Sequence, residues 1–445
     1  MTFSNRDLRK LLLPLIAEQV LTSMMGIVDT MMVSNVGSAA VSGVSLVDSI
    51  NKLVLFLFSA LATGGTIVCS QYIGRRDKLH SDRAARQVLL SALALGLLVM
   101  AVCLTFRKGL LRLIFGSVEA DVMAAAEIYF LITALYYPFI ALFNAGAALY
   151  RAAGNSRLPM IVSVSCNGLN VVGNAVLMFV FGMGVKGAAI STTVSIFIAA
   201  VVMLIFLRRP HQAVEVGPLH AIRPDFRTIW LVLSIGIPTG VENAMFQLGK
   251  LVVQSTVSTL GTAAIAANAI VVVIELLTSM PSLAIGTGMM TVVGQCIGAG
   301  KLDEAKYYTK KLTLWSAVVL LGINWAIYFL TGPICALAGM EPDARELTRQ
   351  VMLLISIVKP FLWTMAFMPA HGMRAAGDVR FSMWVSVISM WISRVALTTV
   401  LCRVLGMGLV GVWCGYFADW AVRSTIFTLR YRSGKWSEKK VIDRR

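Results

Sequence analysis

Long apolar runs recur along the whole chain, and they limit its fold more than any other feature. The segments 11–33 and 88–106 hold few charges, and each is close to the roughly 20 apolar residues that a helix needs to cross the hydrocarbon core of a membrane. About ten other segments have the same character. We therefore predict twelve membrane-spanning helices, at residues 11–33, 46–72, 87–106, 124–148, 158–181, 186–207, 229–257, 268–296, 311–331, 348–370, 381–401 and 406–429.

The basic residues predict which ends of these helices face the cytoplasm. Only 14% of the residues are charged, and most of the 39 Lys and Arg lie before the first span, after the even-numbered spans and in the tail. The opposite loops 34–45 and 258–267 hold none. By the positive-inside rule both termini are predicted to be cytoplasmic, in a bacterial plasma (inner) membrane. Topology thus explains the net charge of +17, and no nucleic-acid partner is expected.

The chain also repeats itself at an offset of 224 residues. Pro14 and Glu18 match Pro238 and Glu242, and residues 37–41 (GSAAV) match residues 261–265 (GTAAI). Six helices in each half would insert with the same orientation, as in parallel repeats related by a pseudo-two-fold axis along the membrane normal. The predicted fold is therefore an all-α membrane protein of two six-helix bundles. Its predicted parts are an N-lobe (1–207), a cytoplasmic linker (208–228), a C-lobe (229–432) and a basic cytoplasmic tail (433–445).

Asp29 is the most informative residue inside a predicted span. No basic residue lies within one turn of it, and loss of water disfavours the charge of an isolated carboxylate, which then takes up a proton or attracts a cation. Asn170 and Asn174 share one face of the fifth span, and Thr192 adds a hydroxyl from the sixth. Such oxygens suit a hard cation or a carboxyl proton. The alternative is a structural role, with a protonated Asp29 and amides that join helices.

Four more residues are candidates for a substrate cavity. Glu18 lies three turns before Asp29 on the same side of its helix, and Met25 belongs to a methionine-rich stretch that suits a surface binding varied shapes. Glu242 and Glu275 are the corresponding candidates in the second half. Packing is the alternative role for the methionine.

The remaining polar residues of the spans favour structural roles. Asp48 and Lys52 are spaced to neutralise each other on one helix face. The sequence assigns no partners to four others, which are Lys250, Lys359, Arg394 and Asp419. The seven cysteines and four histidines are scattered, so no structural metal site is expected.

Five motifs in order resemble those of the multidrug and toxic compound extrusion (MATE) transporters, over essentially the whole chain. They are residues 28–32 (VDTMM), 71–74 (QYIG), 151–155 (RAAGN), 170–174 (NVVGN) and 187–192 (GAAIST). The resemblance implies an antiporter that exports organic, often cationic and amphipathic, compounds by alternating access of two lobes. It also implies that Asp29, Asn170, Asn174 and Thr192 form the cation-coupling site, with H⁺, or with Na⁺ bound at Asp29, Asn170 and Asn174.

One departure and two rivals qualify this interpretation. Some members place a cation-binding Glu in the seventh span where this chain has Phe246, so no second-lobe ion site is carried over and the coupling ion stays open between H⁺ and Na⁺. The acid-rich first lobe favours H⁺. A lipid-linked oligosaccharide or lipid flippase of the same wider superfamily is one rival, and a membrane-embedded enzyme is the other. No catalytic constellation stands out, so we expect no enzyme and no cofactor. The expected partners are a small organic substrate and membrane lipids, and the chain is expected to be a monomer.

Overall fold

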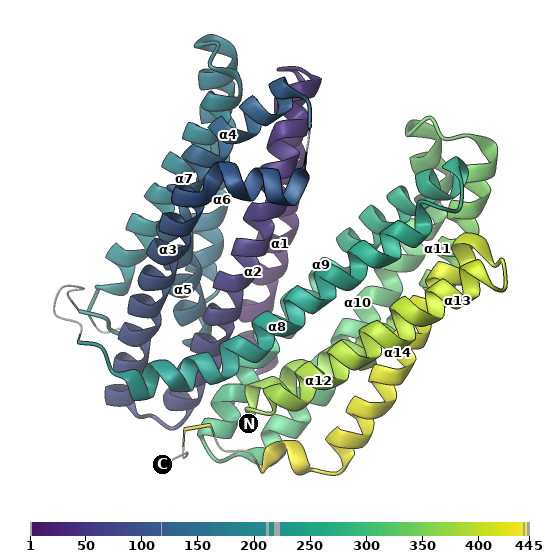
Figure 1. Cartoon of the computed structure of the whole chain (residues 1–445). Helices are drawn as coiled ribbons and strands as arrows, with labels where there is room; N and C mark the ends of the chain where they lie inside the picture. The colour runs from purple at the N-terminus through teal and green to yellow at the C-terminus, as the bar shows by residue number, and fades with distance from the viewer. Residues whose placement is uncertain (1, 117, 211–212, 218–222, 439–440, 443–445) are drawn as a thin grey trace. The chain divides into compact units, whose positions relative to one another are not determined.

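The computed structural model describes residues 2–116, 118–210, 213–217, 223–438 and 441–442, and the regular structure of these residues is helical, with no strand (Figure 1). The first half contains α1 (Asn5–Ser34), α2 (Ser38–Gly74), α3 (Lys78–Phe115), α4 (Ala120–Ala134), α5 (Tyr137–Ala152), α6 (Arg157–Asn174) and α7 (Gly184–Leu207). The second half contains α8 (Phe226–Val257), α9 (Thr262–Gly298), α10 (Leu302–Leu337), α11 (Pro342–Ala375), α12 (Val379–Ser389), α13 (Leu397–Arg403) and α14 (Gly408–Arg432). π-Helical segments follow α6 (Ala175–Val180) and α12 (Met390–Ala396), and a 3₁₀ turn (Lys435–Ser437) follows α14.

All twelve predicted spans fall on helical segments. Within the described ranges, ten helices are long and apolar enough to cross a membrane, and the bent pair α4–α5 adds an eleventh. The helix α14 coincides with the twelfth predicted span. The predicted class, an all-α multi-spanning membrane protein, is therefore confirmed.

The helices extend beyond the apolar runs that predicted them. The third span was expected from residue 87, but α3 begins at Lys78, after Asp77, whose carboxylate accepts a hydrogen bond from the His80 backbone N–H at 3.2 Å. Such a cap satisfies one of the free N–H groups of the first turn. Hydrophobicity marks only the stretch inside the membrane, so it does not report these charged helical ends.

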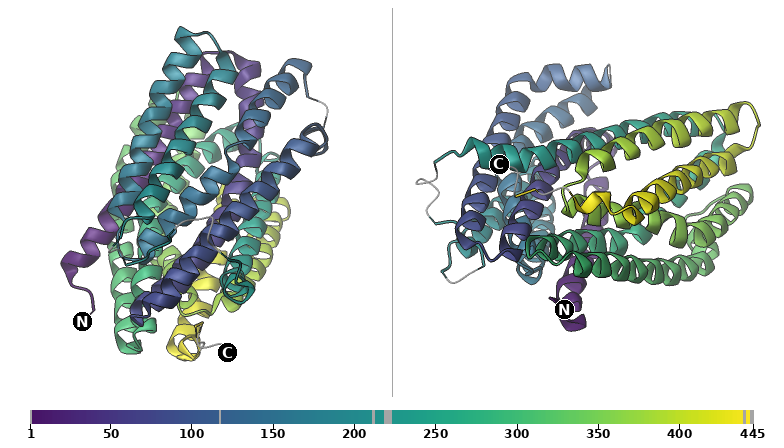
Figure 2. Two further views of the ribbon diagram at one scale, coloured as in Figure 1. Left: turned by 90° about the vertical axis from the view of Figure 1, so that its left-hand side faces the viewer. Right: turned by 90° about the horizontal axis from the view of Figure 1, so that it is seen from below.

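The residues group into two compact units. One comprises Asn5–Gly240, and the other comprises Met1–Ser4 together with Val241–Arg445. Figure 2 shows the helices within each unit running along one another. The division falls inside α8, just after Pro238. The predicted lobe boundaries stay predictions, and residues 211–212 and 218–222 of the linker and 439–440 and 443–445 of the tail lie outside the described part.

The first half of α8 packs closely on α2. A Cβ atom on Gly236 would lie 3.0 Å from the carbonyl oxygen of Ala60, and one on Gly64 would overlap the carbonyl oxygen of Val232. Two helix backbones can approach this closely only where side chains are absent. These glycines therefore join α8 to the helices of the first half.

The fourth span is bent where α4 meets α5. The two helices form an angle of 50°, and Pro138 lies in the first turn of α5, where its missing N–H costs nothing. The proline thus lies close to the bend. Gly96 of α3 packs on it, because a Cβ at Gly96 would lie only 2.6 Å from Pro138 Cα.

Gly96→Ala is therefore expected to destabilise the protein by about 1–3 kcal/mol, since the added methyl forces apart two backbones that cannot yield. Thermal unfolding in detergent would measure the effect. Gly322→Ala in α10 is the matched control, because a Cβ there meets nothing within 4 Å. An equal melting temperature for Gly96→Ala and the wild type would show that the contact is not tight.

The described part of the predicted linker is anchored to the start of α3. Lys78 Nζ pairs with Glu215 at 2.7 Å, and Arg83 Nε pairs with Asp225 at 2.8 Å. A hydrogen bond from Thr228, aided by the Arg83 charge, holds the pKa of Asp225 below its ordinary value. Asp225 is thus charged at neutral pH and keeps this anchor formed.

Candidate functional site

A cavity of about 210 Å³ lies inside the unit Asn5–Gly240, at the depth of Asp29. Five helices contribute to its wall: α1, α2, α4, α6 and α7. Its polar lining residues are Asp29, Thr30, Ser45, Asp48, Tyr129, Tyr136, Asn174 and Thr192. Three of the four predicted coupling residues therefore face one cavity, and the fourth, Asn170, lies one turn before Asn174 on α6.

Asp29 accepts hydrogen bonds but forms no ion pair among the described residues. Asn174 Nδ2 donates to Asp29 Oδ1 at 3.0 Å. If the Asn170 amide is turned over, its nitrogen lies 3.1 Å from both Asp29 oxygens and its oxygen accepts from Thr192 Oγ1 at 2.9 Å. The sequence prediction that no base compensates Asp29 thus agrees with the geometry, although the role of these residues stays a prediction.

Asn174 also offers an unused acceptor. Its side chain is only 2% exposed, and its Oδ1 atom is buried without a hydrogen-bond partner. A buried amide oxygen without a partner costs free energy, and it is a ready ligand for a proton donor or a cation. The site thus combines a carboxylate, an unpaired amide oxygen and the Thr192 hydroxyl.

Asp48 also lines this cavity, although the sequence favoured a structural role for it. The structure shows no ion pair between Asp48 and Lys52 in the described part; instead Asp48 Oδ1 accepts from Asn51 Nδ2 and from Tyr129 OH, each at 3.4 Å. The i, i+4 spacing pointed to Lys52, whereas the side chain turns to the cavity and to α4. No sequence signal placed Tyr129 beside it.

The first-half cavity candidates lie outside this cavity wall. Glu18 is buried and pairs with Arg151 Nη2 of α5 at 2.8 Å. Met25 is half-buried on α1, next to the lining residue Gly26. The role of Glu18 and Met25 in a substrate cavity stays a prediction.

The second-half acids are also paired with bases. Glu242 pairs with Arg374 at 2.6 Å, and Glu275 pairs with Lys359 at 3.2 Å. The Arg374 partner repeats the Arg151–Glu18 contact at the matching position of the second half. Sequence spacing did not show these pairs, because their members lie on different helices.

The structure also gives Asp419 its partners. This fully buried carboxylate pairs with Arg394 and with Arg423, the latter at 2.7 Å, and it accepts from Ser389 Oγ at 2.6 Å. Phe246 lies beneath the two guanidinium groups and Lys250, with ring centroid distances of 4.7, 5.2 and 5.3 Å. Where some relatives carry an acid, this unit therefore carries an aromatic ring covered by cations.

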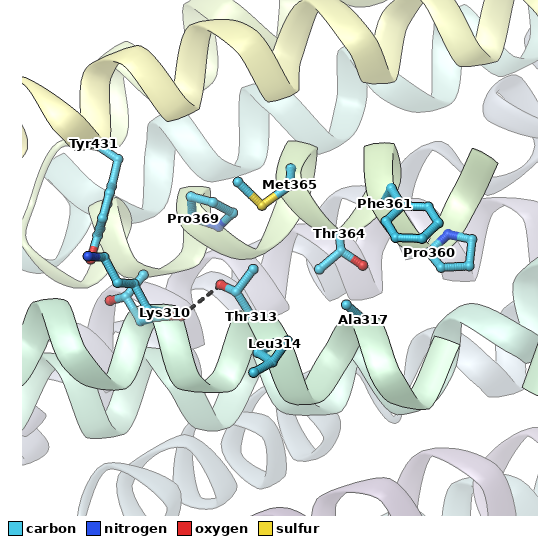
Figure 3. Close-up of a pocket in the computed structure, with 11 residues that line it drawn as sticks. Lys310, Thr313, Leu314, Ala317, Pro360, Phe361, Thr364, Met365, Pro369 and Tyr431 are labelled. Atoms are coloured by element: carbon cyan, nitrogen blue, oxygen red, sulfur yellow. Dashed lines mark hydrogen bonds between the residues drawn. The ribbon is translucent and has the colours of Figure 1, made fainter. Parts of the chain in front are cut away.

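A second cavity, of about 310 Å³, lies between α10, α11 and α14 (Figure 3). Pro360, Phe361, Met365 and Pro369 make most of its wall apolar, and Thr313 Oγ1 turns back to donate to its own helix. The wall contains no acidic side chain. Of these two cavities, the one at Asp29 has acidic side chains in its wall.

Comparison with known proteins agrees with this arrangement. The sequence pattern of the MatE family matches the chain twice, at residues 14–176 and 238–400. The matches begin 224 residues apart, the offset predicted for the repeat.

Similar proteins cover nearly the whole chain. A probable multidrug resistance protein NorM of Thermotoga maritima is 27% identical over 99% of this chain and 94% of that protein. An uncharacterized transporter YisQ of Bacillus subtilis is 26% identical over 96% and 94%. An outward-facing structure of a multidrug resistance MATE family transporter of the MOP superfamily has a TM-score of 0.89 at 20% identity, over 97% and 96% of the two chains. The chain therefore belongs to the MatE family of multidrug efflux transporters, which are not enzymes.

Proposed function

We propose that this protein is an ion-coupled antiporter of the plasma membrane that exports organic, often cationic and amphipathic, compounds, with both termini in the cytoplasm. One observation carries the proposal: Asp29 is a carboxylate without a basic partner in a small cavity, whereas the buried Glu18 and Glu242 each pair with an arginine. A charge that is not compensated inside the protein is one that an ion can neutralise.

The coupling follows from the cost of this charge. With Asp29 ionised, the state in which the cavity is open to water is favoured, because water solvates the carboxylate. An ion that enters from outside neutralises Asp29 and favours a state in which the cavity is closed. A ligand shifts such an equilibrium only through its different affinity for the two states. Substrate release and ion uptake thereby alternate.

The hydrogen bonds favour H⁺ over Na⁺ as the coupling ion. Sodium needs several oxygen ligands at once. The Asn174 side chain, however, turns its amide nitrogen toward the Asp29 oxygens, and so does Asn170 when its amide is turned over. Nitrogen donors in these positions do not bind a cation. A proton needs a single carboxylate oxygen. Sodium at Asp29, Asn170 and Asn174 is the alternative, and it requires those amides to turn their oxygens inward.

Transport in vesicles tests the proposal. Everted vesicles that contain the protein should take up ethidium when a pH gradient is imposed without Na⁺, and nigericin should stop the uptake. A second experiment imposes a Na⁺ gradient while the pH is held equal on both sides. Uptake in that experiment alone would show that Na⁺ is the coupling ion. If neither gradient drives uptake of ethidium, rhodamine 6G or tetraphenylphosphonium, export of organic cations is contradicted.

A lipid flippase is the second candidate, and the cations around Phe246 favour it. Lys250 is exposed and forms no ion pair within the described residues, so it is available to an anionic headgroup. Gradient-independent movement of a fluorescent anionic lipid between the leaflets of proteoliposomes, lost in Lys250→Met, would support this function.

A further inference from the structure

Two carboxylates, rather than one, face the cavity described above. Asp29 comes from α1 and Asp48 from α2, and the volume they share is only about 210 Å³. Two negative charges in one small volume repel, so each disfavours the charged form of the other and their ion binding is coupled. The proposed antiport uses Asp29 alone and leaves Asp48 without a role.

Asp48 is surrounded mainly by neutral donors. Tyr129 OH and Asn51 Nδ2 both reach Oδ1 at 3.4 Å, and Tyr137 OH holds Asn51 by donating to its Oδ1 at 2.8 Å. Asn51, Tyr129 and Tyr137 are buried, so water does not replace them. This network fixes Asp48 at the cavity wall without neutralising it.

The charge of Lys52 acts on Asp48 from a distance, but among the described residues no base forms an ion pair with this carboxylate. Lys52 lies one turn along α2, exposed, and among the described residues it forms no ion pair with Asp48. Asp29 faces it from α1, and the phenols of Tyr129, Tyr136 and Tyr137 face it from α4 and α5. No buried base therefore competes for this carboxylate.

One residue that lines the cavity also has an unused hydrogen-bond acceptor. This residue is Asn174, whose buried Oδ1 atom has no hydrogen-bond partner, while its Nδ2 donates to Asp29. An acceptor in this position can receive a hydrogen bond from a protonated carboxyl group or bind a cation. The cavity thus has more acceptor capacity than one ion at Asp29 uses.

We propose that Asp48 is a second coupling residue, and that the cavity takes up two positive charges in each transport cycle, one at Asp29 and one at Asp48. This inference rests on the proposed antiport function. Asp48 acts directly on the ion, whereas Tyr129 and Asn51 are positioning residues.

The number of ions exchanged per ethidium ion tests this proposal. In proteoliposomes with equal ethidium on both sides, exchange of two protons for one ethidium cation moves one net charge, so a membrane potential can stop it against a fixed pH gradient. Exchange of one proton for one ethidium cation is electroneutral, so no membrane potential stops it. The wild type should exchange two protons per ethidium ion, and Asp48→Asn should exchange one. Asp121→Asn, which removes an exposed acid of α4 outside the cavity wall, is the matched control and should keep two. A ratio that is unchanged in Asp48→Asn would overturn the inference.

A second measurement needs no substrate and covers the case in which Asp48→Asn folds poorly. Infrared difference spectra between high and low pH contain bands from many of the 22 Asp and Glu residues, so the bands of the cavity are those that change in Asp29→Asn and in Asp48→Glu. Each of these two variants should change one carboxyl band. Tyr129→Phe should keep both bands and change the pH at which the Asp48 band titrates. A spectrum in which Asp48→Glu changes no titrating band would also overturn the inference. If wild-type vesicles show no ion-driven uptake at all, the antiport function fails instead.

Discussion

Asp29→Asn is expected to reduce gradient-driven ethidium uptake to a small fraction of the wild-type rate. The amide has nearly the same shape as the carboxylate but is permanently neutral, so ion binding cannot change its charge. Switching a two-state protein from 1:99 to 99:1 takes a difference in binding of roughly 10⁴-fold between the two states, or about 5.5 kcal/mol. The variant loses the contribution of Asp29 to this free energy, and only an ion at Asp48 could still supply part of it.

The fold should survive this change, because Asp29 has no ion pair to lose and lies in a half-exposed position. An unchanged melting temperature in detergent would separate loss of coupling from loss of structure. Asp121→Asn again serves as the matched control. Full gradient-driven uptake by Asp29→Asn would show that coupling lies elsewhere.

The largest expected loss of stability belongs to Asp419→Ala. The variant leaves the Arg394 and Arg423 guanidinium groups, 2% and 1% exposed, without their shared carboxylate. Removing one partner from a buried charge network typically costs about 3–5 kcal/mol, because the remaining charges stay desolvated. Thermal unfolding in detergent should show a clear fall in melting temperature.

Two comparisons make the reason for this loss testable. Lys301→Ala breaks the exposed Lys301–Glu304 pair and should change the melting temperature little. Replacing the whole network by apolar residues, with Asp419→Leu, Arg394→Met and Arg423→Met together, should recover much of the lost stability. If the triple variant is as unstable as Asp419→Ala, packing rather than uncompensated charge would explain the effect.

The sequence predicted the helices well because hydrophobicity acts over about 20 residues at a time. It also pointed to Asp29, Asn170, Asn174 and Thr192 as candidate site residues, since each is a polar residue within an apolar run, and their role stays a prediction. The structure brings these residues together from three helices.

The pairing of charges could not be predicted in the same way. Glu18 and Arg151 are 133 residues apart, and Glu242 and Arg374 are 132 apart, so which base meets which acid depends on helix packing. Asp48 shows the opposite error, because Lys52 at i+4 is near in sequence while Tyr129 of α4 is the closer partner in space. Local spacing describes one helix, whereas the site is built by five.

The tight contact of α8 with α2 has a consequence for dividing the protein. A gene split between α7 and α8 would yield a first fragment whose α2 exposes the bare groove at Gly64, and a second that begins with the helix made to fill it. Neither fragment would be complete by itself. When the two fragments are co-expressed, α8 should dock on α2 at these glycines and restore a working transporter. Such a complementation experiment would therefore measure how well one helix docks at a glycine contact.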